Sequence, residues 1–206
     1  MQLSNFPRAS LAHLPTPLEH MPRLSEHLDG PDIYVKRDDC TGLASGGNKT
    51  RKLEFLMAEA LAQGADTVLT TGGLQSNHVR QTAAACARLG LACHLVLVRS
   101  VDWNDPAYGT SGNVQLDHLL GAQVHMVPGG TDREKALARL ARVLQSQGRK
   151  PYVIPGGGSN ATGSLGYVAC ALELAEQAGE QGETIDCLVH ATGSGGTQGG
   201  LVAGNA

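Results

Sequence analysis

TVLTTGGLQSNHVRQTAAACARLG, residues 67–90, contains a short strand, a glycine turn and a helix in direct succession. The first four residues are β-branched or apolar, as in a buried strand. Ser76 or Asn77 can cap the helix that follows. Gly90 can end that helix after about Leu89, because glycine favours the left-handed conformation found at helix C-termini. The stretch therefore predicts one strand–helix unit of an α/β protein.

The same alternation of strands and helices extends over the rest of the chain. We expect further strands at residues 33–36, 93–98, 124–127, 152–154 and 185–190. We expect further helices at residues 50–61, 112–120, 132–147 and 165–177, and the start of another at about Thr197. Strands that alternate with helices predict parallel sheets with right-handed crossovers, in which ligands bind beyond the carboxyl ends of the strands.

The composition is that of a globular protein that binds neither nucleic acid nor membranes. The chain has 206 residues, of which 41% are hydrophobic and 17% charged, and its net charge is −3. This balance suits a packed core and disfavours a general nucleic-acid-binding surface. No apolar run approaches the roughly 20 residues of a membrane span. The five cysteines form no CxxC pair and no apolar leader precedes them, so we expect reduced thiols, a cytoplasmic protein and no zinc site.

The segment HATGSGGTQGG, residues 190–200, places a glycine-rich turn between an expected strand and the start of a helix. Backbone N–H groups at the start of a helix bind anions, so the turn can form a phosphate cradle. The cradle residues are Gly193, Ser194, Gly195, Gly196 and Thr197. The segment lacks the lysine of an NTPase P-loop and the regular spacing of a dinucleotide-binding turn. The alternative is a tight strand–helix turn that binds no ligand.

Lys49 follows two glycines and an asparagine, in SGGNK, at the expected start of a helix. The positive end of the helix dipole and the nearby cations Arg51 and Lys52 disfavour its ammonium form. A lysine that is partly neutral near neutral pH can act as a nucleophile, and the glycine turn lets a flat ligand approach it. The alternative is a solvated lysine. We expect Arg51 and Lys52 to be either the electrostatic surroundings of Lys49 or a solvated face.

The turn TTGGLQSNH, residues 70–78, offers polar groups just after the strand expected at residues 67–70. Ser76 and Asn77 can bind a ligand through their side chains. The alternative is that one of them is an ordinary helix cap. We expect His78 to lie on the surface.

Four segments that occur in a fixed order resemble one known family. They are KRDDCTGLASGGNKTRKLEFL, GGLQSNHVRQTAAACARLGL, PGGGSNATGSLGYV and HATGSGGTQGGL. Together they resemble the D-cysteine desulfhydrase / 1-aminocyclopropane-1-carboxylate (ACC) deaminase family, to which L-cysteate sulfo-lyases also belong. These are pyridoxal-phosphate enzymes of the tryptophan-synthase-β fold, or fold type II. The resemblance runs from about Phe6 to Ala206, which is essentially the whole chain.

The resemblance implies a role for each candidate residue. Lys49 would form the Schiff base with pyridoxal 5'-phosphate and, together with Ser76, would be catalytic. Asn77 would hydrogen-bond the 3-hydroxyl group of the cofactor. Ser76 would bind the substrate carboxylate or take part in proton transfer. The five cradle residues would hold the phosphate group, and no metal is implied.

The resemblance implies a carbon–sulfur lyase that performs α,β-elimination on a cysteine-like amino acid. D-cysteine would give pyruvate, sulfide and ammonia; the alternatives are sulfite release from L-cysteate and ring opening of ACC. ACC deaminases typically have SNQ where this chain has SNH ending at His78, and a cysteine where it has Gly158. Both departures favour a sulfur-releasing lyase. A nucleotide-dependent oxidoreductase and an inactive fragment are the alternatives from other classes.

The resemblance also implies a domain organisation. Residues 1–50 and 155–206 would form a large cofactor domain, residues 51–154 a small domain, and the cofactor would lie between them. Each domain would be a three-layer unit around a parallel sheet. We expect a C-terminally truncated chain with an incomplete large domain, because the helix that starts at about Thr197 stops after its first turns. We further expect a homodimer whose substrate is a small amino acid.

Overall fold

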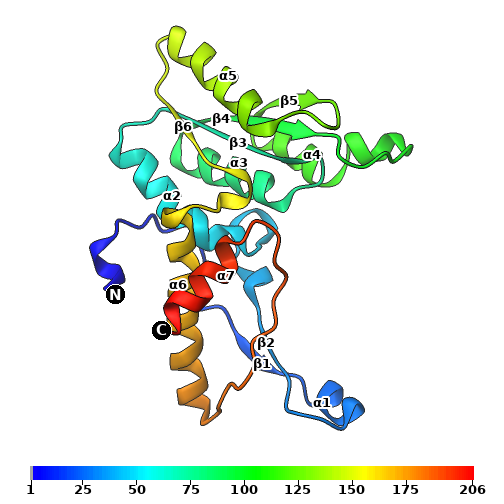
Figure 1. The fold of residues 1–206 in the computed structure, drawn as a ribbon, viewed down its shortest axis with the longest axis vertical. Coiled ribbons are helices and arrows are strands. Elements are labelled where there is room, and N and C mark those ends of the chain that lie inside the picture. Colours follow the sequence, from blue (N-terminus) through cyan, green and yellow to red (C-terminus); the bar gives the residue numbers. More distant parts are fainter. Residues whose placement is uncertain (1) are drawn as a thin grey trace.

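A parallel sheet of four strands lies in the upper half of the molecule in Figure 1. The computed structural model describes residues 2–206. The strands are β3 (Thr67–Gly73), β4 (Ala92–Val98), β5 (Gln123–Val127) and β6 (Pro151–Val153), and their spatial order is β5-β4-β3-β6. Every neighbouring pair in this sheet is parallel. The expected α/β class is therefore confirmed.

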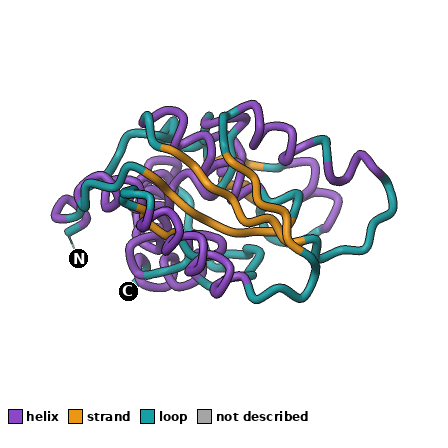
Figure 2. Tube along the Cα trace, turned by 90° about the horizontal axis from the view of Figure 1, so that it is seen from above, coloured by secondary structure: helices purple, strands orange, loops and turns teal. Residues whose placement is uncertain are grey.

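Helices cover both faces of this sheet, because successive residues of a strand point to opposite faces. Val68, Leu95 and Leu97 belong to the main core, which they share with residues of α2, α3 and α4. Leu69 and Val96 face the other way and pack against α5. These helices are α2 (Lys49–Ala62), α3 (Asn77–Leu89), α4 (Gly112–Leu119) and α5 (Arg133–Ser146). Figure 2 shows the strands side by side between the helices, so this unit has three layers.

The strand order places a topological switch point between β3 and β6. The chain proceeds from β3 to β4 to β5 in one direction and then returns to place β6 on the other side of β3. In such sheets, ligands bind beyond the carboxyl ends of the strands where the order reverses. The glycines at positions 72–73 end β3, and those at positions 156–158 lie in the loop that leaves β6. The topology therefore directs both glycine loops to one site.

The long helix α6 (Ala161–Gln181) packs against both α2 and α7 (Gly196–Gly204). Glycine permits both contacts. A Cβ atom on Gly166 of α6 would lie 2.4 Å from the carbonyl carbon of Arg51 in α2. A Cβ atom on Gly200 of α7 would lie 2.6 Å from the Cβ atom of Tyr167 in α6. The helices therefore approach this closely because these two positions lack side chains.

We expect Gly166→Ala to lower the free energy of unfolding by about 1–3 kcal/mol or more, because the added methyl group would meet backbone atoms of α2. Gly179→Ala is a matched control in the same helix, since a Cβ atom there would meet no atom within 4 Å. The control should raise the free energy of unfolding by roughly 0.5–1 kcal/mol. Urea denaturation measures both changes. Two variants of equal stability would contradict the close packing of α6 on α2.

The lower half of the molecule contains a small antiparallel sheet. Its strands are β1 (Leu18–His20) and β2 (Tyr34–Lys36), and α1 (Pro22–Leu28) connects them. The sequence pattern predicted β2 but neither β1 nor α1. Both are too short to show a clear hydrophobic periodicity. Short 3₁₀ helices are η1 (Leu3–Asn5), η2 (Asp38–Cys40), η3 (Leu43–Ser45), η4 (Pro106–Gly109) and η5 (Gly156–Gly158). Within residues 2–206, none of the helices combines the length and the apolar character needed to cross a membrane.

The strand expected at residues 185–190 is not formed. Residues 183–195 are irregular, and Val189 is 91% exposed. A strand needs a neighbour for its N–H and C=O groups, and no strand of the described chain pairs with this segment. The second parallel sheet of the expected fold is therefore not present among residues 2–206. The second sheet observed there is the antiparallel pair of β1 and β2.

Candidate active site

Lys49 is the first residue of α2 and lies half-buried at the end of a glycine turn. Burial lowers the pKa of its amine. The turn passes close to α3, since a Cβ atom on Gly47 would lie 2.4 Å from the side-chain nitrogen of Gln81. The side-chain oxygen of Gln81 accepts hydrogen bonds from the backbone N–H and the hydroxyl of Thr50, at 2.8 and 2.9 Å. The start of α2 is thus held in place by α3.

Asn48 links Lys49 to Asn77, the first residue of α3. Its side-chain oxygen accepts hydrogen bonds from the Lys49 amine at 3.2 Å and from the Asn77 amide at 3.1 Å. Ser76 precedes Asn77 as the N-cap of α3, and its hydroxyl oxygen accepts from the N–H of Val79 at 3.4 Å. A hydroxyl that accepts a hydrogen bond can still donate its proton to a ligand. The structure therefore brings three of the predicted site residues together.

The predicted cradle residues lie around the N-terminus of α7. Gly195 is the N-cap, with a φ of +80°, and no side chain caps this helix. N–H groups in the first turn of a helix have no intrahelical partners and attract anions. The Ser194 hydroxyl lies 2.6 Å from that of Ser159 in the loop after β6. Gly193 and Ser194 are exposed, Thr197 is half-buried and Gly196 is buried.

Lys52 is a site residue that the sequence pattern did not identify. Of the two alternatives for Lys52, a solvated face is wrong because the residue is only 1% exposed, and a place in the electrostatic surroundings of Lys49 agrees with the structure. Its amine donates to the Ser159 hydroxyl at 3.1 Å and to the Gly157 carbonyl at 3.2 Å. A Cβ atom on Gly196 would lie 2.9 Å from this amine, so Lys52 lies against the first turn of α7. Lys52 therefore adds a positive charge to the cradle.

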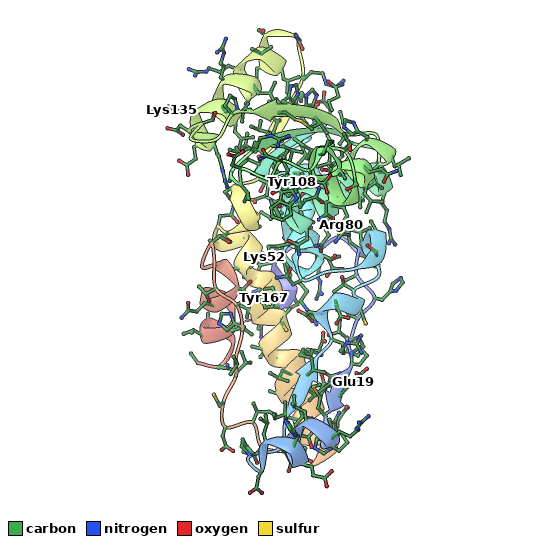
Figure 3. The ribbon with its side chains drawn as sticks, turned by 90° about the vertical axis from the view of Figure 1, so that its right-hand side faces the viewer. Glu19, Lys52, Arg80, Tyr108, Lys135 and Tyr167 are labelled. Carbon is green, nitrogen blue, oxygen red and sulfur yellow. The ribbon has the colours of Figure 1, made fainter. Side chains whose placement is uncertain are left out.

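The environment of Lys52 explains its titration. Burial and, to a smaller extent, the charge of Lys49 together lower the pKa of its amine to about 8. Its Nζ atom lies 6.0 Å from the centre of the Tyr167 ring, and Figure 3 shows both residues in the middle of the molecule. The spacing offered a signal: residues three apart on a helix lie on the same face. A role for Lys49 therefore already implied that Lys52 is near the same ligand.

Arg51 is also buried rather than solvated, but it belongs to an ion cluster. Its guanidinium is fully buried and donates to the carboxylates of Asp38 and Glu173 at 2.8–3.0 Å. Lys36 donates to Glu173 at 2.5 Å, and the Tyr167 hydroxyl donates to Asp38 at 2.9 Å. The cluster joins α2 to α6 and to the segment after β2. Arg51 therefore holds the structure together, whereas Lys52 faces the candidate site.

His78 is buried, so the expectation of a surface histidine is wrong as well. Its Nε2 lies 2.8 Å from the Thr70 hydroxyl, and its Nδ1 has no hydrogen-bond partner among residues 2–206. Burial, together with the charges of Lys49 and Lys52, lowers the pKa of the ring to about 3. His78 is therefore neutral at neutral pH and does not compete with the two lysines for an anion.

The combined groups suit a phosphate compound that carries an electrophile. The N-terminus of α7, the hydroxyls of Ser159 and Ser194, and the amine of Lys52 are donors of the kind that can bind a phosphate. The half-buried amine of Lys49 is a nucleophile when neutral.

The family described as "Pyridoxal-phosphate dependent enzyme" matches residues 9–206 of this chain. The D-cysteine desulfhydrase of Serratia proteamaculans (strain 568) is 53% identical over 203 residues, which cover 98% of this chain and 61% of that protein. The D-cysteine desulfhydrase of Klebsiella pneumoniae (strain 342) is 52% identical over 202 residues, with the same coverage of 98% and 61%. The chain thus spans about 61% of the length of these curated relatives.

Solved structures show the same relationship. A crystal structure described as an ACC deaminase homologue superposes with a TM-score of 0.86 at 40% identity and covers 98% of this chain and 59% of its own. The diaminopropionate ammonia lyase of Escherichia coli superposes with a TM-score of 0.70 at 20% identity, covers 92% of this chain and 54% of its own, and shows a shared fold alone. By the family match over residues 9–206 and these similarities, the chain belongs to the pyridoxal-phosphate dependent enzyme family.

Proposed function

We propose that the whole protein is a pyridoxal-phosphate-dependent carbon–sulfur lyase that converts D-cysteine to pyruvate, sulfide and ammonia. One observation carries the proposal: the half-buried Lys49, hydrogen-bonded through Asn48 to Asn77, lies one helical turn before Lys52, which contacts an uncapped helix N-terminus. The similarity to proteins named D-cysteine desulfhydrase supports the choice of substrate.

The residues present fit the cofactor. The first turn of α7, Ser194, Ser159 and Lys52 supply N–H, hydroxyl and ammonium donors for the phosphate group. Lys49 would hold the cofactor covalently, and Asn77 would donate to its 3-hydroxyl group. When bound, pyridoxal phosphate supplies an electron sink for the negative charge that develops at the substrate Cα atom.

The side chains of the chain would then divide the remaining tasks. Burial lowers the pKa of Lys49, so more of its amine is neutral and able to accept the substrate α-proton near neutral pH. Ser76 would donate its hydroxyl proton to the substrate carboxylate or take part in proton transfer. Lys52 would offset the charge of the phosphate and keep that group in the cradle.

The surroundings of Gly158 support a sulfur-releasing lyase over an ACC deaminase. A Cβ atom at this position would lie 3.1 Å from a methyl group of Leu56, and 3.6 Å from both Lys52 and His78. The φ of +62° also disfavours a residue with a side chain. This site therefore disfavours the cysteine that the deaminases have here.

The ACC deaminase homologue at 40% identity makes ring opening of ACC the second candidate. The protein is first loaded with pyridoxal phosphate. Its activity is then measured in separate assays with D-cysteine, L-cysteate and ACC. We expect sulfide and pyruvate from D-cysteine at a higher kcat/KM than turnover of the other two. Sulfite from L-cysteate, or ammonia from ACC, as the faster reaction would overturn the proposed substrate.

We expect Lys52→Met to weaken the binding of pyridoxal phosphate about 10- to 100-fold, because a hydrogen bond to a charged group contributes about 1.5–3 kcal/mol. Lys52→Arg keeps the positive charge and should therefore lose less of the affinity for pyridoxal phosphate. Equilibrium dialysis of the cofactor measures the dissociation constants. An unchanged constant in Lys52→Met would remove Lys52 from the cradle.

The pKa of about 8 gives Lys52 a further signature in the protein without cofactor. Below this pH the amine is protonated, and above it the positive charge is lost. The affinity for inorganic phosphate should therefore fall as the pH rises through about 8. In Lys52→Arg the affinity should fall less over this range, because a guanidinium remains charged. Parallel pH profiles in the two proteins would contradict this assignment.

Several wider features of the protein remain proposals. We propose residues 1–50 and 155–206 as a large domain and residues 51–154 as a small one, supported by the location of the parallel sheet within residues 67–153. We also propose a homodimer and a small amino-acid substrate, the latter supported by the relatives named D-cysteine desulfhydrase. A cytoplasmic location is supported by five cysteines that are all free thiols.

A further inference from the structure

The loop that leads into Lys49 has an unusual backbone. Ala44, Ser45, Gly46 and Gly47 all have positive φ angles, of 44°, 65°, 78° and 133°. Glycine adopts such angles readily, but Ala44 and Ser45 carry Cβ atoms that disfavour them. A conformation of this kind persists only where the surrounding contacts hold it. The loop therefore needs an external support immediately before the candidate Schiff-base lysine.

Arg80 provides that support from α3. It is only 6% exposed, and its guanidinium donates to the carbonyl oxygens of Ala44 and Gly46, the latter at 3.0 Å. These two carbonyls flank Ser45, so one planar guanidinium spans the left-handed stretch. Lysine could not reproduce this, because its compact ammonium lacks the rigid fork of donors. Figure 3 labels Arg80 in the middle of the molecule.

The guanidinium is itself fixed by α4 and by the loop after β3. Its Nε atom donates to the side-chain oxygen of Asn113 at 2.7 Å. Asn113 donates two hydrogen bonds to Gln75, from its backbone N–H to the side-chain oxygen and from its side-chain amide to the carbonyl oxygen, both of 2.9 Å. Burial lowers the pKa of Arg80, and the nearby carboxyl group of Asp117 opposes that shift. Arg80 is therefore a rigid connection between the sheet unit and the loop.

The position of Arg80 along α3 explains why this connection matters to the site. Asn77 lies three residues earlier on the same helix and shares the side-chain oxygen of Asn48 with Lys49. One helix thus presents Asn77 to the site and holds the loop that carries Lys49. We propose that Arg80 is a positioning residue, which holds residues 44–47 in the left-handed conformation and so sets the Lys49 amine relative to Asn77. This rests on the proposed function of Lys49.

The test compares Arg80→Lys with Arg88→Lys, a control on the same helix. The Arg88 side chain is exposed, and within residues 2–206 its one hydrogen bond is to the carbonyl oxygen of Leu11, at 3.3 Å. Hydrogen–deuterium exchange of the peptide 42–50 reports the order of the loop. We expect exchange about tenfold faster in Arg80→Lys and unchanged in Arg88→Lys.

A second readout is the pKa of the Lys49 amine, measured in the protein without cofactor. The pH dependence of its acetylation by acetic anhydride, measured by mass spectrometry, gives the pKa of Lys49. In Arg80→Lys this pKa should rise toward the ordinary value of a lysine, because a loosened loop lets water reach the amine. Exchange and pKa values equal to those of Arg88→Lys would overturn the proposal.

Two more variants keep the test decisive. Ala44→Gly added to Arg80→Lys should recover part of the protection of peptide 42–50 against exchange, because glycine adopts positive φ freely. If Arg80→Lys merely lowered the stability of the whole protein, this recovery would not be expected. Asn113→Ala leaves Arg80 in place and removes the acceptor of its Nε atom, together with the side-chain hydrogen bond from Asn113 to the Gln75 carbonyl. It gives the same comparison if Arg80→Lys does not fold. Failure of the wild-type protein to attach pyridoxal phosphate at Lys49 would refute the proposed function, while the exchange and acetylation results would still decide the role of Arg80.

Discussion

Lys49→Ala should abolish the covalent attachment of pyridoxal phosphate and lower sulfide release from D-cysteine by about a thousandfold or more. The methyl group of alanine can neither bond to the cofactor nor accept the substrate α-proton. The lowered pKa of Lys49 makes it suited to both tasks, because it keeps part of the amine neutral near neutral pH. The visible absorbance of the bound cofactor and the rate of sulfide release measure the two effects.

Lys52→Met is the matched control for this experiment. It removes the neighbouring amine, which also has a lowered pKa, but leaves Lys49 in place. At saturating cofactor the control should keep the visible band, since its defect is in affinity. A band that persists in Lys49→Ala and disappears in Lys52→Met would reverse the roles of the two lysines.

Arg51→Met should lower the free energy of unfolding by about 3–5 kcal/mol, which is a large part of the stability of a typical domain. The change leaves the carboxylates of Asp38 and Glu173 with one fewer partner in a buried cluster. Methionine fills much of the arginine volume, so the loss would come from the uncompensated charges and not from a cavity. Urea denaturation at pH 7 measures the change.

The pH dependence of stability separates this explanation from simple packing. Burial raises the pKa of Glu173, but hydrogen bonds from Arg51 and Lys36 outweigh it and hold the pKa at about 2, below its ordinary 4.5. A lowered carboxylate pKa adds stability that is present above about pH 4.5 and is lost as the pH falls toward 2. Arg51→Met should lose much of this dependence.

Arg37→Met is the control for the ion cluster. Arg37 also pairs with a carboxylate, that of Asp39 at 2.8 Å, but on the surface. Exposed ion pairs contribute little to stability. Its removal should therefore leave the unfolding curve almost unchanged. A loss as large as that of Arg51→Met would contradict the distinction between the buried and the exposed pair.

The sequence predicted the elements that depend on local pattern. The strands from β2 to β6 and the helices from α2 to α7 all lie close to their expected positions, because apolar runs, caps and glycine stops are local signals. The strand expected at residues 185–190 failed because a strand also needs a partner, which a local apolar run cannot reveal.

The burial of the cations could not be predicted for a related reason. Arg51 and Lys52 look like a solvated face of α2, since nothing nearby in the sequence neutralises both of them. Their partners are distant: Glu173 lies 122 residues from Arg51, and Ser159 lies 107 residues from Lys52. The burial of His78 could not be predicted for the same reason, since it depends on how α3 packs against the loop after β6.

We expect Lys49, and not the neighbouring Lys52, to bind the cofactor covalently. Incubation of the wild-type protein with pyridoxal phosphate, reduction with sodium borohydride and mass mapping of the peptides identify the modified lysine. We expect the pyridoxyl group on Lys49, because the Lys52 amine is engaged by Ser159 and Gly157 beside the phosphate cradle. A pyridoxyl group on Lys52, or none on either lysine, would contradict the claim.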